Sequence, residues 1–171
     1  MSAINIPKAF EGAVAATIVA TADLKELPRL RTWQAVDSDA RWSPAQDRKF
    51  PLYELRASPP LLSEEAGATL MCPVNIQIGT NAADDKTHRN VALYYAAAQQ
   101  VIDNLYAQYR SGTAGDERDA FDAHMSNKEP DVAATIEIGG FSHGDGFEPF
   151  EEEGVNFIGV SLIIHYSRSD Y

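Results

Sequence analysis

The segment 139–154 holds the side chains of this sequence that are best suited to chemistry. It combines five glycines, three phenylalanines, one histidine and several carboxylates. Calcium and magnesium prefer oxygen ligands, so Asp145, Glu148 and the run 151–153 could bind either ion. His143 would extend such a site to a transition metal. The spacing matches neither a helix–loop–helix calcium loop nor a zinc hydrolase, so we assign no metal ligand and interpret the segment as a hairpin tip with solvated charges and partner-contacting aromatic rings.

A second acidic group precedes the longest helical pattern of the chain. Asp84, Asp85 and His88 lie close enough in sequence to form a small acid–histidine cluster. A simpler interpretation is that the two aspartates complement the positive end of a helix dipole while the histidine faces solvent. We favour that structural role.

The remaining candidates for catalysis are isolated. His165 lies within a strand pattern, and Ser161 lacks the glycine-flanked turn that exposes a nucleophile. The sequence contains no phosphate-binding loop, dinucleotide fingerprint or paired-cysteine motif. We therefore predict that the protein is not an enzyme and uses no cofactor.

Composition narrows the class of protein further. The 171 residues are 44% hydrophobic, which is enough for one domain around a single core. The net charge of −11 argues against a surface that neutralises nucleic-acid phosphates or anionic lipid. The single cysteine, Cys72, excludes an intrachain disulfide and fits a reducing compartment.

Hydrophobic periods predict the elements that position these residues. Apolar residues alternate from Cys72 to Ile78 as in a strand, and helical spacing follows from Val91 to Tyr109. The final strand is apolar on both faces, which predicts either a central strand or a strand that is covered on both faces. Pro73 predicts a sheet edge, a bulge or a strand start at its position. The expected helices are 7–22, 84–110 and 116–125, and the expected strands are 50–57, 68–80, 132–141 and 155–166.

This order predicts a single α+β domain, 1–171, with a mostly antiparallel sheet of about four to five strands packed by two main helices. Two segments fall outside the regular pattern: a long excursion at 29–49, with one short strand around 32–36, and the acidic hairpin loop at 142–154. The first helix resembles a signal peptide, but Glu11 and the lone basic Lys8 favour an uncleaved helix, and its apolar run is too short to span a bilayer.

Charge and aromatic placement suggest contacts between subunits. The basic excursion contrasts with the acidic region 116–153, which allows head-to-tail contacts that close into a ring, and scattered surface charge fits the same pattern equally well. At least one of the four tyrosines of the long helix should point away from its apolar stripe, where it suits an interface, and core packing alone is the alternative. The candidate interface residues are Glu148, Glu151, Glu152, Glu153, Arg29, Arg31, Arg41 and Tyr106.

The arrangement resembles the tail terminator and neck proteins of tailed bacteriophages. The resemblance rests on the first helix, the strand 74–80, the turn 84–89, the long helix and the closing strand 159–166, and it covers about two thirds of the chain. It implies a homohexameric ring in the virion, assembled in the bacterial host cytoplasm, which caps the tail tube and joins it to the head-side connector. Genomic DNA would pass through the lumen without tight binding, and no membrane would be involved.

Two other functions remain open from the sequence. One is a small metal-dependent or acid–base enzyme that uses His143, Asp145 and Glu148. The other is a monomeric adaptor that binds a protein partner through the arginine patch of the excursion.

Overall fold

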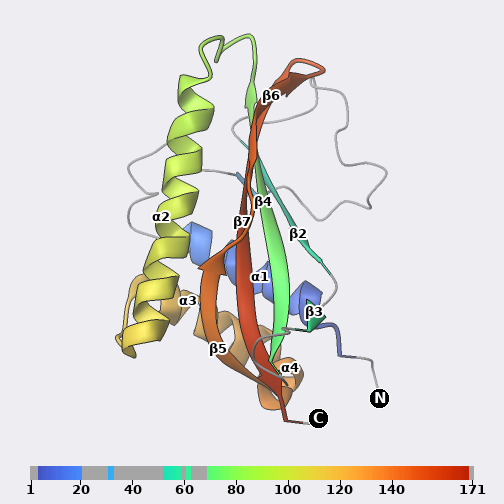
Figure 1. Cartoon of the computed structure of the whole chain (residues 1–171), viewed down its shortest axis with the longest axis vertical. Coiled ribbons are helices and arrows are strands. Elements are labelled where there is room, and N and C mark those ends of the chain that lie inside the picture. The colour runs from blue at the N-terminus through green and yellow to red at the C-terminus, as the bar shows by residue number, and fades with distance from the viewer. Residues whose placement is uncertain (1–3, 21–30, 33–51, 59–60, 63–68, 170–171) are drawn as a thin grey trace.

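A computed structural model describes residues 4–20, 31–32, 52–58, 61–62 and 69–169 (Figure 1). Within these ranges the helices are α1 (Ile6–Ala20), α2 (Arg89–Ser111), α3 (Asp116–Lys128) and α4 (Pro130–Thr135). The strands are β1 (Arg31–Thr32), β2 (Leu52–Ala57), β3 (Leu61–Leu62), β4 (Leu70–Asn81), β5 (Ile136–His143), β6 (Phe147–Glu152) and β7 (Val155–Arg168). Of the predicted excursion, 29–49, only β1 falls in the described part of the chain.

The strands form one sheet in the order β1-β2-β4-β7-β5, with β3 also pairing with β4 and β6 with β7. All of these pairings are antiparallel except that of β1 with β2. The predicted α+β class with a mostly antiparallel sheet is therefore confirmed. The last strand is central in this sheet, because β7 lies between β4 on one side and β5 and β6 on the other.

The long helices pack on one face of this sheet. Phe10 of α1 contacts Tyr166, and Tyr109 of α2 contacts Phe141, with ring centroids 5.2 and 4.7 Å apart. Phe141 pairs with Ile164, two residues from Tyr166, so both contacts lie on the same face. We call this the helix face. The opposite face carries the alternate residues of the central strands, among them Asn75, Gln77, Ser161 and Phe157.

Pro73 lies inside a central strand, at the point where one neighbour of β4 is replaced by another. Strand β2 pairs with β4 as far as Val74, and β3 begins at Met71. The carbonyl of Pro73 accepts a hydrogen bond from the Ser58 amide at 2.8 Å. The nitrogen of Pro73, which has no hydrogen to donate, faces the same break between β2 and β3, so the strand is locally edge-like as the proline predicted.

Three predicted boundaries were wrong. Residues 130–135 form helix α4, with Pro130 in its first turn, so the predicted strand at 132 begins only at Ile136. Helix α2 begins at Arg89 rather than at Asp84. The predicted loop 142–154 is largely strand, because β6 occupies its second half. None of the helices in the described ranges is long and apolar enough to cross a membrane.

Candidate functional site: the acidic tip

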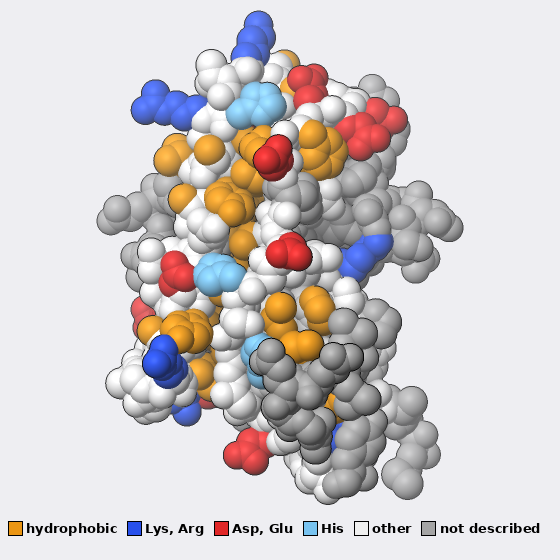
Figure 2. All heavy atoms as spheres, in the orientation of Figure 1, with side chains coloured by type: hydrophobic (Ala, Val, Ile, Leu, Met, Phe, Trp, Pro, Cys, Tyr) orange, Lys and Arg blue, Asp and Glu red, His pale blue; other side chains and the backbone are white. Residues whose placement is uncertain are grey.

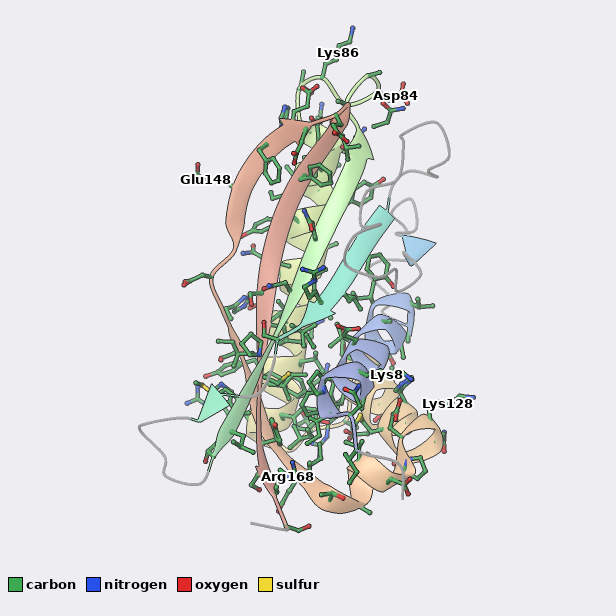
Figure 3. The ribbon with its side chains drawn as sticks, turned by 90° about the vertical axis from the view of Figure 1, so that its right-hand side faces the viewer. Lys8, Asp84, Lys86, Lys128, Glu148 and Arg168 are labelled. Carbon is green, nitrogen blue, oxygen red and sulfur yellow. The ribbon has the colours of Figure 1, made fainter. Side chains whose placement is uncertain are left out.

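Two connections meet at one end of the long axis of the molecule. They are the turn between β4 and α2, residues 82–88, and the hairpin formed by β6 and the start of β7, residues 147–157 (Figure 1). We call this end the acidic tip. Figure 3 shows Asp84 and Lys86 at its summit and Glu148 projecting outward from β6.

The chain reaches the hairpin by running closely along one edge of β7. The amide of Gly144 donates to the Ser161 carbonyl at 2.7 Å as the chain leaves β5. At Gly146 an added Cβ would lie 2.6 Å from the Gly159 carbonyl oxygen, so a larger residue would not fit. Two of the glycines in this unusual segment thus have a structural explanation: they let one edge of β7 pair first with β5 and then with β6.

The hairpin itself ends in a tight two-residue turn. Glu153 and Gly154 have φ values of 52° and 78°, and the flanking residues Glu152 and Val155 are paired. Positive φ at both central positions is the geometry of a type I′ turn, whose twist matches that of a two-stranded ribbon. The acidic run therefore belongs to a regular hairpin.

Two hydrogen bonds attach the hairpin to the neighbouring turn. The amide of Ala82 donates to the Gly154 carbonyl at 2.9 Å. The side chain of Asn156 donates through Nδ2 to the Asp85 carbonyl at 2.6 Å. Because Asn156 is buried, this second bond lies in the interior of the tip, where a bond to protein is stronger than at the surface.

The centre of the tip is the buried carboxylate of Asp85, which is only 3% exposed. It accepts hydrogen bonds from the Asn90 amide at 2.9 Å, the Val91 amide at 3.0 Å and the Thr80 hydroxyl at 2.8 Å. Burial alone would raise the pKa of Asp85, but these hydrogen bonds outweigh it and hold the pKa below its ordinary value. Asp85 thus satisfies the first amides of α2 and fixes the helix to β4.

The surface of the tip is mainly acidic with an aromatic centre. Glu148, Asp84 and the run 151–153 are exposed, and the exposed cations in the adjoining turn and first helical position are Lys86 and Arg89. Phe150 is 39% exposed and its ring lies 5.1 Å from that of buried Phe157. This combination suits contact with a surface that offers both apolar area and positive charge.

The residues of the alternative metal site are not gathered. His143 lies at the end of β5, where its Nε2 is 2.6 Å from Oδ1 of Asp103 on α2. Within the described part of the chain, no three His, Cys, Asp or Glu side chains are grouped so that they could hold a metal ion. His143 instead joins the edge of the sheet to the middle of α2.

The other candidates from the sequence occupy structural positions. His88 has a left-handed backbone with φ of 59° directly before α2, and Asp84 is exposed rather than part of a helix. Ser161 is buried, and Nε2 of His165 lies 2.8 Å from the Ser142 hydroxyl on the face opposite the helices. Cys72 is buried, and burial together with the nearby charge of Glu11 raises the pKa of its thiol to about 12.

The predicted interface residues are only partly described. Tyr106 is 42% exposed on α2, with the Arg110 guanidinium 5.6 Å from its ring centroid. The glutamates of the hairpin are exposed as expected. Arg29 and Arg41 lie outside the described residues, and so does the side chain of Arg31, whose backbone pairs with Leu52.

Sequence reasoning missed the residues that hold the tip together. Thr80 and Asn156 were not singled out, since each is one of several polar residues in its strand. Their role depends on the pairing of Thr80 with Asn156 across β4 and β7, which places both beside Asp85. The one local signal was the pair of aspartates before the helix.

Comparisons with known proteins add no family assignment. The chain matches no protein-family model, and a search of the curated proteins finds no match.

Proposed function

We propose that this chain is a structural subunit of a ring at the head–tail junction of a tailed bacteriophage, where it terminates the tail tube and joins it to the head-side connector. The observation that carries the proposal is the acidic tip, a fixed projection at one end of an α+β body. A projection whose backbone is already ordered loses little conformational entropy when it docks, so it suits assembly between rigid components.

The distribution of charge supports a DNA-conducting role without DNA binding. Residues 57–171 include eighteen acidic and six basic residues, whereas residues 1–56 include seven and eight. Tight binding to duplex DNA depends on cations that contact phosphates. A lumen formed by the acidic part of the chain would repel the phosphates and allow DNA to slide.

The same imbalance supports self-association. The eight basic residues of the first part supply charges that can attract the acidic surplus of another copy. When the two surfaces differ, the contact is heterologous, and it closes into a ring if the rotation between copies fits.

The first experiment is to measure the mass distribution of the purified chain over a wide concentration series and to image large species by electron microscopy. We expect closed rings of one subunit count with a central channel, and no retention of duplex DNA at low salt. A chain that stays monomeric at every concentration, or that retains DNA tightly, would contradict the proposal.

Charge removal at the tip tests whether the projection is used in assembly. Replacing Glu151, Glu152 and Glu153 by glutamine should weaken assembly, measured as ring formation and as attachment of rings to tail tubes or connectors, while leaving thermal unfolding unchanged, because all three side chains are exposed. The matched control is the same charge change at exposed Asp119, Asp131 and Glu137, on α3, α4 and β5. Equal attachment of both variants would exclude the hairpin as the docking element.

A further inference from the structure

Helix α2 carries little charge between its two ends for a helix with one exposed side. Three of its 23 residues are charged, Arg89 and Arg110 near the ends and Asp103 between them, whereas the chain average of 23% would place about five in a segment of this length. Asp103 is itself engaged by His143. A surface helix normally presents charged residues on the face opposite the core, so α2 resembles a helix that is covered on both sides.

The outward face of α2 is apolar in its first half. The buried face consists of Val91, Tyr94, Ala97, Ala98, Val101, Ile102 and Leu105. On the other side Ala92 and Ala96 are exposed and Leu93 is 49% exposed. Arg89, one turn before Leu93, gives this patch a basic end. Figure 2 shows hydrophobic side chains exposed along the α2 side of the molecule.

Strand β6 presents the complementary chemistry. Phe150 is exposed at the centre of the strand, and Glu148 and Glu152 lie two residues to either side of it. Strand alternation puts Glu152 on the same face as Phe150. A register shift between Phe147 and Phe150 interrupts the alternation at Glu148, which is exposed nearby. The β6 surface therefore combines an aromatic ring with carboxylates, whereas the α2 surface is an aliphatic patch beside a guanidinium.

These two surfaces lie at the same end of the molecule but on opposite faces of the sheet. Phe150 stacks on Phe157, which is adjacent in β7 to Asn156 and Ile158 and so points away from the helix face. The hydrogen bond from Ala82 to Gly154 places the hairpin beside the turn that leads into α2. One copy can thus contact the next at the same height, and a rotation about an axis that is parallel to the long axis of the molecule, and displaced from it, can close such contacts into a ring without a rise between copies.

We propose that β6 of one copy docks on the first half of α2 of the next copy, with Phe150 against Leu93 and the flanking glutamates facing Arg89. This inference rests on the proposed ring function and names its subunit interface. The contact buries apolar area that α2 otherwise exposes, and the charge pair sets its orientation.

A mixing experiment tests the interface, because each copy carries two different surfaces. Leu93→Glu disables the helix surface, and Phe150→Glu disables the hairpin surface, so the two disabled surfaces are both acidic and repel each other. Leu93 and Phe150 are 49% and 39% exposed, so both variants should keep the wild-type fold in thermal unfolding. Each variant alone should self-associate about tenfold or more weakly than wild type. An equimolar mixture should form a one-to-one heterodimer of twice the 18.7 kDa subunit mass, since one intact surface of each kind remains.

The matched control is Val19→Glu, the same charge change at an apolar side chain of α1 that is 63% exposed, and it should assemble as wild type does. Wild-type association of either interface variant would overturn the inference while leaving the ring proposal standing. A mixture that stays monomeric would overturn the pairing of these two surfaces. Dimers or open filaments of the wild type that both variants abolish would support the interface and contradict the ring, whereas a wild type that never associates would overturn both.

Discussion

At the end of the sheet covered by α1 and α3, five aromatic rings pack against one another: Phe10, Tyr109, Phe121, Phe141 and Tyr166. Their contacting centroids are 4.7 to 6.5 Å apart. At the acidic tip the corresponding contacts are hydrogen bonds to one buried carboxylate, Asp85. We call the first group the basal cluster.

The two ends are held together by different kinds of contact. Contacts at one end mainly stabilise the fold, and contacts at the other mainly fix the position of the hairpin. Apolar packing in the basal cluster has no strict direction and grows with the area removed from water. Hydrogen bonds to Asp85 add less net free energy, but they require particular distances and angles and so fix the hairpin relative to α2. A functional projection at the second end can therefore be altered without loss of the fold.

The largest expected effect is in the basal cluster. Phe121 is fully buried and its ring contacts those of Phe10, Tyr109 and Phe141. Phe121→Ala should lower the free energy of unfolding by about 3–5 kcal/mol, because it removes buried area and leaves a cavity. Chemical denaturation measures this change. A loss no larger than that of Phe150→Ala, whose ring is partly exposed, would contradict the importance of the cluster.

An intermediate effect is expected at the tip. Asp85→Asn keeps the side-chain shape but removes the charge that strengthens three hydrogen bonds, so unfolding should become easier by about 1–3 kcal/mol. Hydrogen exchange should show where this happens: the amides of Asn90 and Val91 should exchange faster, while those around Phe121 stay protected. If amide exchange became equally faster at the tip and in the basal cluster, the two ends would unfold together rather than independently.

The smallest expected effect is a change of stability with pH, which should have opposite signs for the carboxylates of Asp85 and Glu11. The folded pKa of Asp85 lies below its unfolded value, so its contribution is present above the unfolded pKa and lost as the pH falls below about 4. In that acid range the difference in free energy of unfolding between wild type and Asp85→Asn should become smaller. Burial raises the pKa of Glu11 despite a hydrogen bond from the Ala57 amide, so its contribution is lost as the pH rises through the folded pKa.

Glu11→Gln provides the control of opposite sign. Wild type should lose stability relative to Glu11→Gln as the pH rises from about 4, in contrast to the result for Asp85→Asn. Denaturation curves for the three proteins over the acid range test both signs together. A gap for Asp85→Asn that stays constant down to strongly acid pH would exclude the assigned role of its carboxylate.

Much of the fold was predictable because burial leaves a period in the sequence. Alternation from Cys72 to Ile78 and helical spacing from Val91 to Tyr109 each gave the correct element. The prediction failed at 132–135, where Val132 and Ala134 also alternate, because Pro130 favoured a first helical turn and a short segment carries both periods equally well.

The candidate site was predicted less completely. The acidic composition of the segment was evident from the sequence, but strand β6, which carries these residues, was not predicted. This strand has little apolar alternation and depends on pairing with β7. The type I′ turn at Glu153 and Gly154 was likewise not singled out, although a glycine at that position is its main sequence signal.

By itself the sequence determined the α+β class, the apolarity of β7 on both faces and the acidic character of the hairpin, because each follows from residue types and spacings along the chain. Only the tertiary structure decided that Asp85 is buried, that Thr80 and Asn156 meet it, and that Phe150 and Leu93 lie on opposite faces at one end. These relations join residues up to seventy-one positions apart. Pairing of distant strands creates them, and no local period records which strands will pair.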